Sequence, residues 1–600
     1  MADTPQAAHT DWKPGPGDVR GLSVLQVPGH SAVRDDSFLL DPEETKAWIS
    51  GLPMANIQET ARLVFETLSE FNRQAIPDEL RVQTAEIFRQ PIRYISGNFE
   101  KYYIDAAFPL SAKNHKTVAL NRELHAELAI SYKIFIRDAL LGRKRISRRL
   151  LALSIHRAIG CLSEILLISS LAHERPPRNT WREIHYLFAL AAKNEVHRLP
   201  VGDAVERPAD NGCIADLYKR ILLHALAPLC HLRQRENQSL YHKLLEWTAY
   251  ARLSTPAALN DHGEQFVAHL SSDHPPHHLS LERNGLTRRC CLLDTRDLVR
   301  HLRNLLEAPR RQKDKRPGAA WPPRPLLRHL IRNWSGRPRR KHARTRLHFD
   351  LKLAIGIPSV HSLVKARTRK DTAIPAGQRG GPARFPHAHD SGPPRDWSDF
   401  PSTPAGPPGR NANSRSHFPA PSAETTLKDN VHAPWAGAAP RNGIRIFECK
   451  TSNESAGGYC IDWEGADVPK IKPGELIGIQ SAGNDRQFGI GTTRWIKAAQ
   501  GQKLQLGMQL LAPHSLAVQT RLDAGDCDNT AGIHDCLLVP EAKAMNTPLS
   551  LIAPAHSYRE GDIIWISTGS SERRVRLAQA LESTPAFTQY QIARHSPHPR

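Results

Sequence analysis

The spacing of the apolar residues changes once along this chain, and that change constrains the fold more than any other feature. Between residues 56 and 253, apolar residues recur every three or four positions, which is the period of an amphipathic helix. From Arg346 onward they recur every second position, which is the period of a half-buried strand. The sequence therefore predicts a multidomain α+β protein in which an all-α part precedes a β part.

The helical period begins at a clear start signal. Asn56 and Glu59 have the spacing of a capping box, and Ile57, Ala61 and Val64 then fall on one helix face. Further apolar stripes cover 120–140, 150–171, 181–192, 214–229 and 240–253. We expect an α-helical domain at 51–255, preceded by a disordered lead-in at 1–50 that is polar and rich in turn-forming residues.

A basic connector follows the helical domain. Residues 256–335 predict a small β element, including an alternating run at 265–270, and basic helices at 296–307 and 325–334. Between Arg300 and Arg346 there are 16 Lys or Arg residues against 2 Asp or Glu. This stretch carries most of the net charge of +21, and a field of that sign favours polyanions and phosphorylated ligands.

The β part predicts two modules. Residues 336–365 hold a basic loop and a first strand, 441–520 supply further short alternating strands separated by turn residues, and together these indicate an antiparallel barrel. The 366–440 segment between them is predicted to be a disordered insertion, because residues 371–440 contain 13 Pro and 7 Gly. A small β-rich C-terminal module is expected at 533–596.

One polar motif stands at the entrance to a barrel strand. Asn453, Ser455 and Gly458 fit the pattern (Asp/Asn)-x-Ser-x-x-Gly. Residues two apart in an extended chain point to the same side, so an amide and a hydroxyl could meet the edge of one planar ligand. The glycine lets the backbone turn or come close to a neighbour. The alternative interpretation is that these residues simply form a turn before a strand.

Two arginines precede the first barrel strand. Arg340 and Arg344 each offer a rigid planar fork suited to phosphate oxygens or to the O6/N7 edge of guanine. The same spacing occurs in the pairs Arg296/Arg300 and Arg328/Arg332, but those lie on expected helices and are interpreted as solvated faces.

The order of these motifs resembles the PilZ domain family of bacterial cyclic di-GMP receptors. The resemblance implies a six-stranded barrel whose basic loop wraps the dinucleotide against the outer face. It further implies that Arg340 and Arg344 bind phosphates and guanines, and that Asn453, Ser455 and Gly458 form the opposing recognition surface. The chain departs from the family because Asn453 follows Arg344 by 109 positions, although this longer loop costs only on the order of 1 kcal/mol.

The functional prediction is a cyclic di-GMP receptor in which ligand binding rearranges a helical domain that contacts an unknown protein effector. The helical region is similar in texture to that of longer bacterial PilZ-containing proteins, and no site is transferred from that likeness. Two alternatives stay open. The basic stretch would also attract a nucleic acid, and the barrel could be a vestigial scaffold without ligand affinity.

Other functions are not indicated. Motifs of catalysis or cofactor binding are not found, so neither an enzyme nor a cofactor is expected. His274, His277 and His278 are separated by Pro275 and Pro276 without a carboxylate in the pattern, and we expect a solvated loop and no metal site. Nine cysteines without a CxxC pair, no signal peptide and a short longest apolar run predict a cytoplasmic protein without membrane insertion.

Overall fold

A computed structural model describes most of the chain outside its longest linkers. The described residues are 22–29, 31, 38–141, 147–202, 212–229, 232–256, 265–282, 285–308, 322–336, 345, 348–373, 446–455, 457–463, 470–481, 488–499, 503–523, 532–541, 547–568 and 571–594. They form two compact units. The first comprises Met1–Lys341, Pro469–Pro473 and Trp495–Gln505, and the second comprises His342–Val468, Gly474–Arg494 and Leu506–Arg600.

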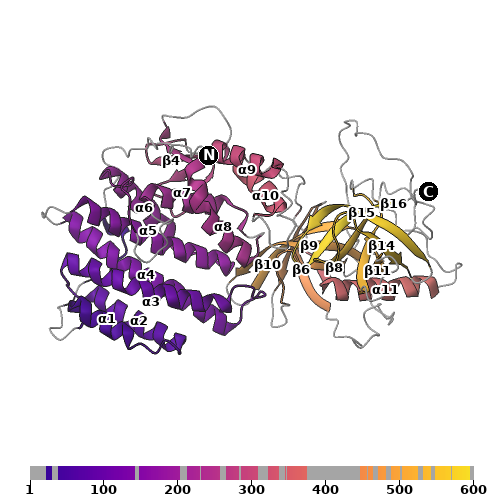
Figure 1. Ribbon diagram of the computed structural model, residues 1–600, viewed down its shortest axis with the longest axis horizontal. Helices are drawn as coiled ribbons and strands as arrows, with labels where there is room; N and C mark the ends of the chain where they lie inside the picture. The colour runs from indigo at the N-terminus through magenta and orange to yellow at the C-terminus, as the bar shows by residue number, and fades with distance from the viewer. Residues whose placement is uncertain are drawn as a thin grey trace. The chain divides into compact units, whose positions relative to one another are not determined.

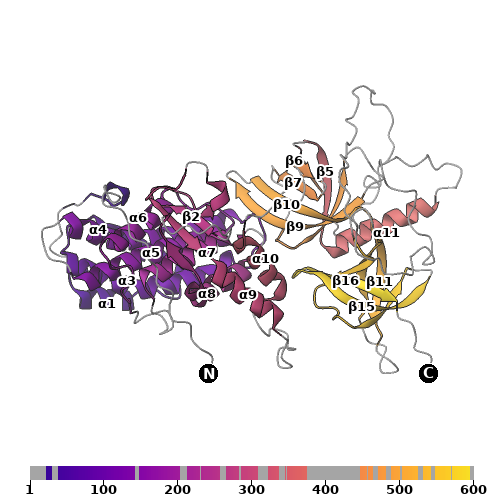
Figure 2. The ribbon, with the colours of Figure 1, turned by 90° about the horizontal axis from the view of Figure 1, so that it is seen from above.

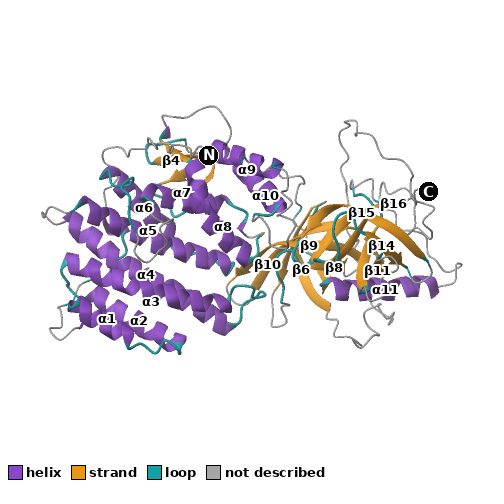
Figure 3. Ribbon diagram, in the orientation of Figure 1, coloured by secondary structure: helices purple, strands orange, loops and turns teal. Residues whose placement is uncertain are grey.

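Helices dominate the first unit, which confirms the predicted all-α N-terminal region (Figures 1 and 3). They are η1 (Leu22–Val24), η2 (Phe38–Leu40), α1 (Pro42–Ser50), α2 (Ile57–Arg73), α3 (Asp78–Phe99), η3 (Glu100–Tyr102), α4 (Ala112–Leu141), α5 (Arg148–Leu171), α6 (Thr180–Lys193), α7 (Ile214–Leu226), α8 (Gln234–Trp247) and η6 (Thr248–Tyr250). Helix α5 packs against α4, α6, α7 and α8. It is long and apolar enough to cross a membrane, yet 72% of its most apolar window is buried, as in the core helix of a bundle.

Two helical segments differ from the expectation. Within the predicted lead-in at 1–50, α1 starts at Pro42, and the Asp41 carboxylate accepts a hydrogen bond from the Glu43 N–H at 2.8 Å. Helix α3 was not predicted at all. Pro91 lies inside this helix, and Arg81 is buried on its core side. Proline is unusual within a helix and arginine is unusual in a core, so these residue types do not indicate a core helix.

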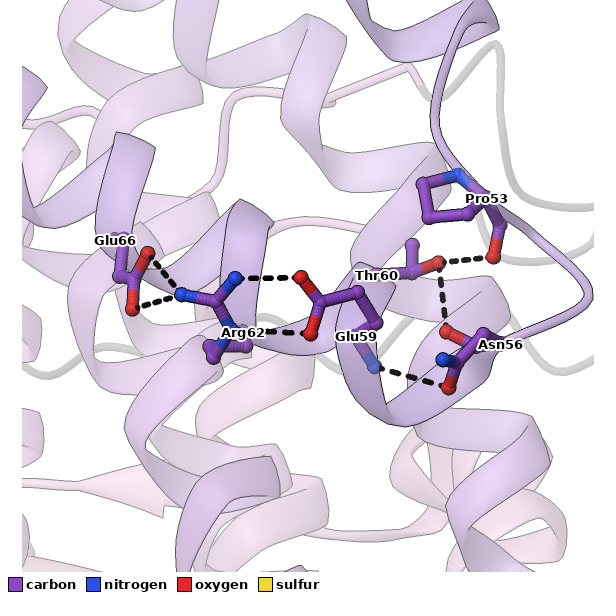
Figure 4. A network of polar contacts seen from close by, with 6 residues as sticks. All are labelled: Pro53, Asn56, Glu59, Thr60, Arg62 and Glu66. Carbon is purple, nitrogen blue, oxygen red and sulfur yellow. Dashed lines mark hydrogen bonds and ion pairs between the residues drawn. The ribbon is translucent and has the colours of Figure 1, made fainter.

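The predicted start of α2 is confirmed, with one change in its polar contacts (Figure 4). The Glu59 N–H donates to the Asn56 side-chain oxygen at 3.3 Å, as a capping residue requires. The Glu59 carboxylate does not return this bond but pairs with Arg62, which also contacts Glu66 at 2.8 Å. The hydrogen bond from Arg62 accordingly lowers the pKa of Glu59.

The first unit ends in a small antiparallel sheet and two helices. The strands are β1 (Arg252–Ser254), β2 (Gln265–His269), β3 (His277–His278) and β4 (Cys290–Asp294), in the order β1-β4-β2-β3, and η8 (Leu279–Leu281) follows β3. Helices α9 (Arg296–Glu307) and α10 (Arg324–Trp334) come next. The fully buried Trp334 packs edge-on against Trp247 at 6.1 Å between ring centroids, which fixes α10 to the helical core.

A closed six-stranded barrel, which confirms the predicted barrel, lies in the second unit except for residues 495–505 at the ends of two of its strands. Its strands are β5 (Asp350–Ile355), β6 (Ile446–Ser455), β7 (Gly458–Trp463), β8 (Leu476–Ser481), β9 (Phe488–Ala499) and β10 (Lys503–Ala512), in the order β10-β7-β6-β5-β8-β9. The insertion predicted at 366–440 lies outside the described residues from position 374 onward.

The first barrel strand is shorter than the alternation suggested. It ends at Ile355, because Gly356 takes a φ of +82° that turns the chain into a helix, α11 (Ile357–Ala373). Ile357, which continues the alternation that begins at Arg346, and residues 366–373 of the predicted insertion therefore belong to this helix. Ile357, Val360 and Val364 recur at helical spacing, a short signal that the preceding alternation concealed.

The C-terminal module is a second closed six-stranded barrel. Its strands are β11 (Leu516–Leu522), β12 (His534–Val539), β13 (Ser550–Pro554), β14 (Ile563–Ser567), β15 (Glu572–Ser583) and β16 (Phe587–Arg594). Residues 516–520, which were expected in the first barrel, pair instead with β12 and β14. Apolar residues alternate with the same period in both barrels, so the alternation does not show which barrel contains this strand.

Helix α11 lies between the two barrels (Figure 2). Val360 is fully buried in a cluster that takes Leu476 and Ile490 from the first barrel and Leu537 and Phe587 from the second. One helix thus supplies a shared apolar core, which joins the barrels into a single compact unit.

Candidate ligand-binding site

The Asn-x-Ser-x-x-Gly motif forms the tight hairpin between β6 and β7. Asn453 and Ser455 are the last alternate residues of β6, and Gly458 is the first residue of β7. Ser455 lies directly opposite Gly458, and its hydroxyl donates to the Gly458 carbonyl at 3.1 Å. The structure therefore brings these three predicted site residues together.

A β-bulge determines which way the motif faces. Thr451 lies opposite Ile461, but Asn453 lies opposite Cys460, so Ser452 is the extra residue on β6. Residues opposite each other share a face, and Thr451 and Ile461 are both fully buried. The bulge moves Asn453 and Ser455 onto the opposite face of the strand pair. Without it, Asn453 would point the same way as Thr451.

Gly458 is required by a close approach between strands. Its φ is +146°, and a Cβ atom at this position would lie 2.0 Å from the Met508 carbonyl oxygen on β10. The neighbouring Gly457 carbonyl accepts a hydrogen bond from the Leu510 N–H at 3.0 Å. The glycine therefore closes the barrel at β10, a role distinct from the recognition surface implied by the family resemblance.

The segment that follows the predicted arginines is bonded directly to the motif. The Thr345 N–H donates to the Glu454 carbonyl at 2.8 Å, and the Glu454 N–H donates to the Thr345 carbonyl at 2.9 Å. Glu454 stands between Asn453 and Ser455, and consecutive Cα atoms are about 3.8 Å apart. The end of the arginine loop is thus held beside the motif, although Arg340 and Arg344 themselves lie outside the described residues.

Three further bonds extend this contact toward β5. The Thr451 N–H donates to the Phe349 carbonyl at 3.0 Å, and the Phe349 N–H donates to the Thr451 hydroxyl at 3.1 Å. The His348 ring nitrogen Nδ1 lies 2.9 Å from the Thr451 carbonyl oxygen. The chain leading into the first barrel strand therefore runs along β6 past the bulge, despite the long insertion that separates the two in sequence.

The carboxyl group of Glu454 faces away from Asn453 and Ser455. Glu454 lies opposite Tyr459, which shares the face of Ile461. Partial burial raises the pKa of Glu454, against the effect of its hydrogen bond with Tyr459. The same burial, together with this carboxyl group, raises the pKa of the Tyr459 phenol. The acidic residue inside the motif is therefore directed away from an anionic ligand on the outer face.

Sequence reasoning missed two residues of this surface. Thr345 acts through its backbone, and no side-chain signal marks such a role. Lys450 is exposed and lies opposite Asp462, which shares the face of Cys460. Since Cys460 lies opposite Asn453, the Lys450 side chain is on the same face as the motif. Only the position of the bulge shows this, because simple counting along β6 places Lys450 and Asn453 on opposite faces.

The barrel, its arginine-bearing approach segment and the motif hairpin define a PilZ-domain protein. Family models agree across the chain: the N-terminal domain of the cyclic-di-GMP receptor FimW matches residues 43–258, its middle PilZ domain matches 265–516, and the FimW C-terminal β-barrel domain matches 525–594. The chain therefore contains a PilZ domain, and the three models match it in the order N-terminal domain, PilZ domain and C-terminal barrel.

A curated relative matches nearly the whole chain. The cyclic-di-GMP receptor FimW of Pseudomonas aeruginosa is 27% identical over 566 residues, which cover 93% of this chain and 91% of the relative. No solved structure matches the chain.

Proposed function

We propose that this protein is a cyclic di-GMP receptor and that it acts by binding, without catalysis. The observation that carries this proposal is the pair of hydrogen bonds between Thr345 and Glu454, which holds the end of the arginine loop beside Asn453 and Ser455. Cyclic di-GMP carries two phosphates and two guanines. Arginine forks suit both groups, and the amide and hydroxyl of the hairpin suit the edge of a base.

The proposed effect of binding is a rearrangement of the helical region relative to the barrel. Residues 335–344 join α10 to Thr345, and Trp334 fixes the end of α10 to the helical core. A ligand that draws this short connector onto the barrel would favour one arrangement over others, provided that its affinity differs between them. The helical domain would then present a changed surface to a protein effector.

Isothermal titration of the intact chain with cyclic di-GMP tests the proposed site. Arg344→Ala, Asn453→Ala and Ser455→Ala are each expected to weaken binding at least about tenfold, as loss of a charged or base-edge hydrogen bond would. Arg328→Ala is the matched control, because Arg328 is an exposed arginine with the same spacing to Arg332 on α10. Unchanged affinity in all three site variants would refute the site assignment.

The same titration separates the alternatives. A chain that binds duplex or single-stranded DNA at sub-micromolar concentration, with no response to cyclic di-GMP, would be a nucleic-acid-binding protein whose affinity falls steeply with salt. A chain that releases no heat with either ligand would contain a vestigial barrel. A cytoplasmic location is also proposed, and it is supported by seven cysteines that form no disulfide within the described part of the chain.

A further inference from the structure

The small sheet of the helical unit brings together three potential metal ligands. His269, His277 and Glu282 offer ligand atoms that all lie within 4.8 Å of one another. The Glu282 carboxylate oxygen Oε2 lies 2.6 Å from His269 Nε2 and 3.3 Å from His277 Nε2. From the sequence we expect His274, His277 and His278 to lie in a solvated loop, with no carboxylate beside them in the pattern. In the structure His277 and His278 instead form β3, which pairs with β2, and η8 brings Glu282 back to the same place.

The strand register explains why these side chains converge. Val267 lies opposite His277 and His269 lies opposite Cys290, so all four side chains share one face of the sheet. On that face, Val267, Cys290 and Leu292 form a small buried apolar cluster. The histidine pair lies at its edge, with the two rings stacked at 5.6 Å between centroids and 16° between planes. Both rings present Nε2 to the same Glu282 oxygen, so the packing brings these three atoms within reach of a single ion.

Burial distinguishes this cluster from an ordinary surface group of histidines. The Glu282 side chain is only 7% exposed, whereas those of His269 and His277 are 27% and 35% exposed. A carboxylate largely withdrawn from water gains from a nearby cation, and the partly exposed histidines leave a path for one to enter. Without a metal ion, each contact between an imidazole nitrogen and the Glu282 oxygen requires a hydrogen-bonding proton. A metal ion can take the place of these protons.

We propose that His269, His277 and Glu282 bind a divalent transition-metal ion of the zinc class. Two imidazole nitrogens and one carboxylate oxygen form a ligand set that zinc accepts, with a fourth position for water. Ligand atoms about 2.0–2.1 Å from a tetrahedral ion are about 3.3 Å apart. The His277–Glu282 separation already has this value, and the His269–Glu282 contact needs to open by less than an ångström.

Cys290 supports the site from behind. Its buried thiol lies 3.3 Å from Nδ1 of His269, the ring nitrogen that faces away from Glu282. A contact to the second nitrogen orients a ligating imidazole, and such supporting groups typically change metal affinity by 10–100-fold. The bound ion would tie the segment that carries β3 and η8 to the end of β2, and it would be independent of the nucleotide site on the barrel.

Zinc binding by the full-length chain, without an affinity tag, tests this proposal. After chelator treatment and dialysis, a competition titration against a chromophoric zinc indicator is expected to give one tight site per chain. His277→Ala and Glu282→Gln should each weaken that site at least about 100-fold, and Cys290→Ser about tenfold. His274→Ala is the matched control, because His274 is an exposed histidine of the same segment outside the cluster.

Thermal unfolding provides the second measurement. Zinc should raise the melting temperature of the parent chain and of His274→Ala, but not that of Glu282→Gln, which is nearly isosteric and is expected to fold. The proposal fails if the stripped chain takes up no stoichiometric zinc, or if the tight site persists unchanged in both His277→Ala and Glu282→Gln. In the first case the three groups form only a hydrogen-bonded cluster, and in the second the ion binds elsewhere.

Discussion

Thr345 and Glu454 exchange both of their backbone hydrogen bonds, at 2.8 and 2.9 Å, although 108 intervening positions separate them in the chain. This pairing places the residue after Arg344 beside the residue between Asn453 and Ser455. The long insertion therefore leaves Thr345, at the end of the arginine loop, beside the motif. Preorganisation of this kind lowers the cost of ordering a loop when a ligand binds.

Thr345→Pro tests whether the pairing of Thr345 with Glu454 positions the arginine loop, separately from the folding of the barrel. Proline has no N–H, so it removes the bond to the Glu454 carbonyl and also restricts the conformation of Arg344. We expect affinity for cyclic di-GMP to fall at least about tenfold, which corresponds to about 1.4 kcal/mol. Thr345→Ala is the control, since it retains the backbone bonds and should bind normally. Equal affinities in both variants, measured by titration calorimetry, would show that the pairing does not position the loop.

Gly458→Ala should destabilise the first barrel. The added methyl group would lie 2.0 Å from the Met508 carbonyl oxygen, so β7 and β10 would have to separate. The expected cost is roughly 3 kcal/mol, in the range of overpacked or strained positions. Hydrogen exchange measured by mass spectrometry should show faster exchange in β6, β7 and β10. Gly532→Ala is the control, because its nearest neighbour atom lies 3.9 Å away, and similar exchange in both variants would contradict the proposed close approach.

The sequence predicts the architecture well where one periodicity persists. Long helices such as α5 and the alternating strands of both barrels follow from it directly. The prediction from sequence fails where a residue type is unusual for the element that contains it, as Pro91 and Arg81 are in α3. It also fails where pairing between distant strands determines which barrel a strand joins, as for β11. Arg81 is tolerated in the core because its guanidinium donates to the Gln74 carbonyl at 2.6 Å and packs over the Phe71 ring, contacts with no sequence signal.

The candidate site shows a similar division. Asn453 and Ser455 are recognisable from their spacing, because a strand places alternate residues on one face. Their outward direction depends on the bulge at Ser452, which cannot be read without the register of β7. The His269–His277–Glu282 cluster was missed because the three residues span 14 positions and meet only after two chain reversals. The spacing of residues along the chain shows which side chains could bind a ligand, but the tertiary pairing of strands decides which of these side chains meet.

Glu582→Gln should loosen the contact between the two barrels. The Arg494 guanidinium on β9 pairs with both oxygens of Glu582 on β15, at 2.7 and 2.8 Å, and the two side chains are 25% and 17% exposed. Removing one charge leaves a partly buried cation unpaired, which should cost about 1–2 kcal/mol after allowance for solvent screening. Hydrogen exchange in β9 and β15 should quicken by roughly 5- to 30-fold as a result.

The matched control for this ion pair is Glu572→Gln. Glu572 pairs with Arg521 at 3.3 Å within the second barrel, and the two side chains are about half exposed, at 51% and 41%. Exposed pairs contribute little, so this variant should change exchange by less than about twofold. If both glutamine variants behave alike, the Arg494–Glu582 pair is no stronger than a surface contact, and the apolar cluster around α11 holds the barrels together.

Acid should unfold the helical unit before most carboxylates are protonated. Burial lowers the pKa values of His125, His173, His185 and His224 to about 4, from an ordinary value of 6.5. The unfolded chain therefore binds protons more readily, so stability is intact above pH 6.5 and declines as the pH falls from there toward 4. Each histidine should cost about 2 kcal/mol at pH 5, and together they approach the total stability of a typical domain.

Urea denaturation at pH 7.5 and pH 5, followed by far-ultraviolet circular dichroism, measures this effect. His125→Gln removes one titrating group, so the loss of stability between the two pH values should shrink by about 2 kcal/mol. Any packing defect that the glutamine introduces is present at both pH values and cancels in the difference. His242→Gln is the control, because His242 is exposed on α8. An equal pH response in the two variants would mean that His125 gains its proton equally readily in the folded and unfolded chain, contrary to its burial against Ser96.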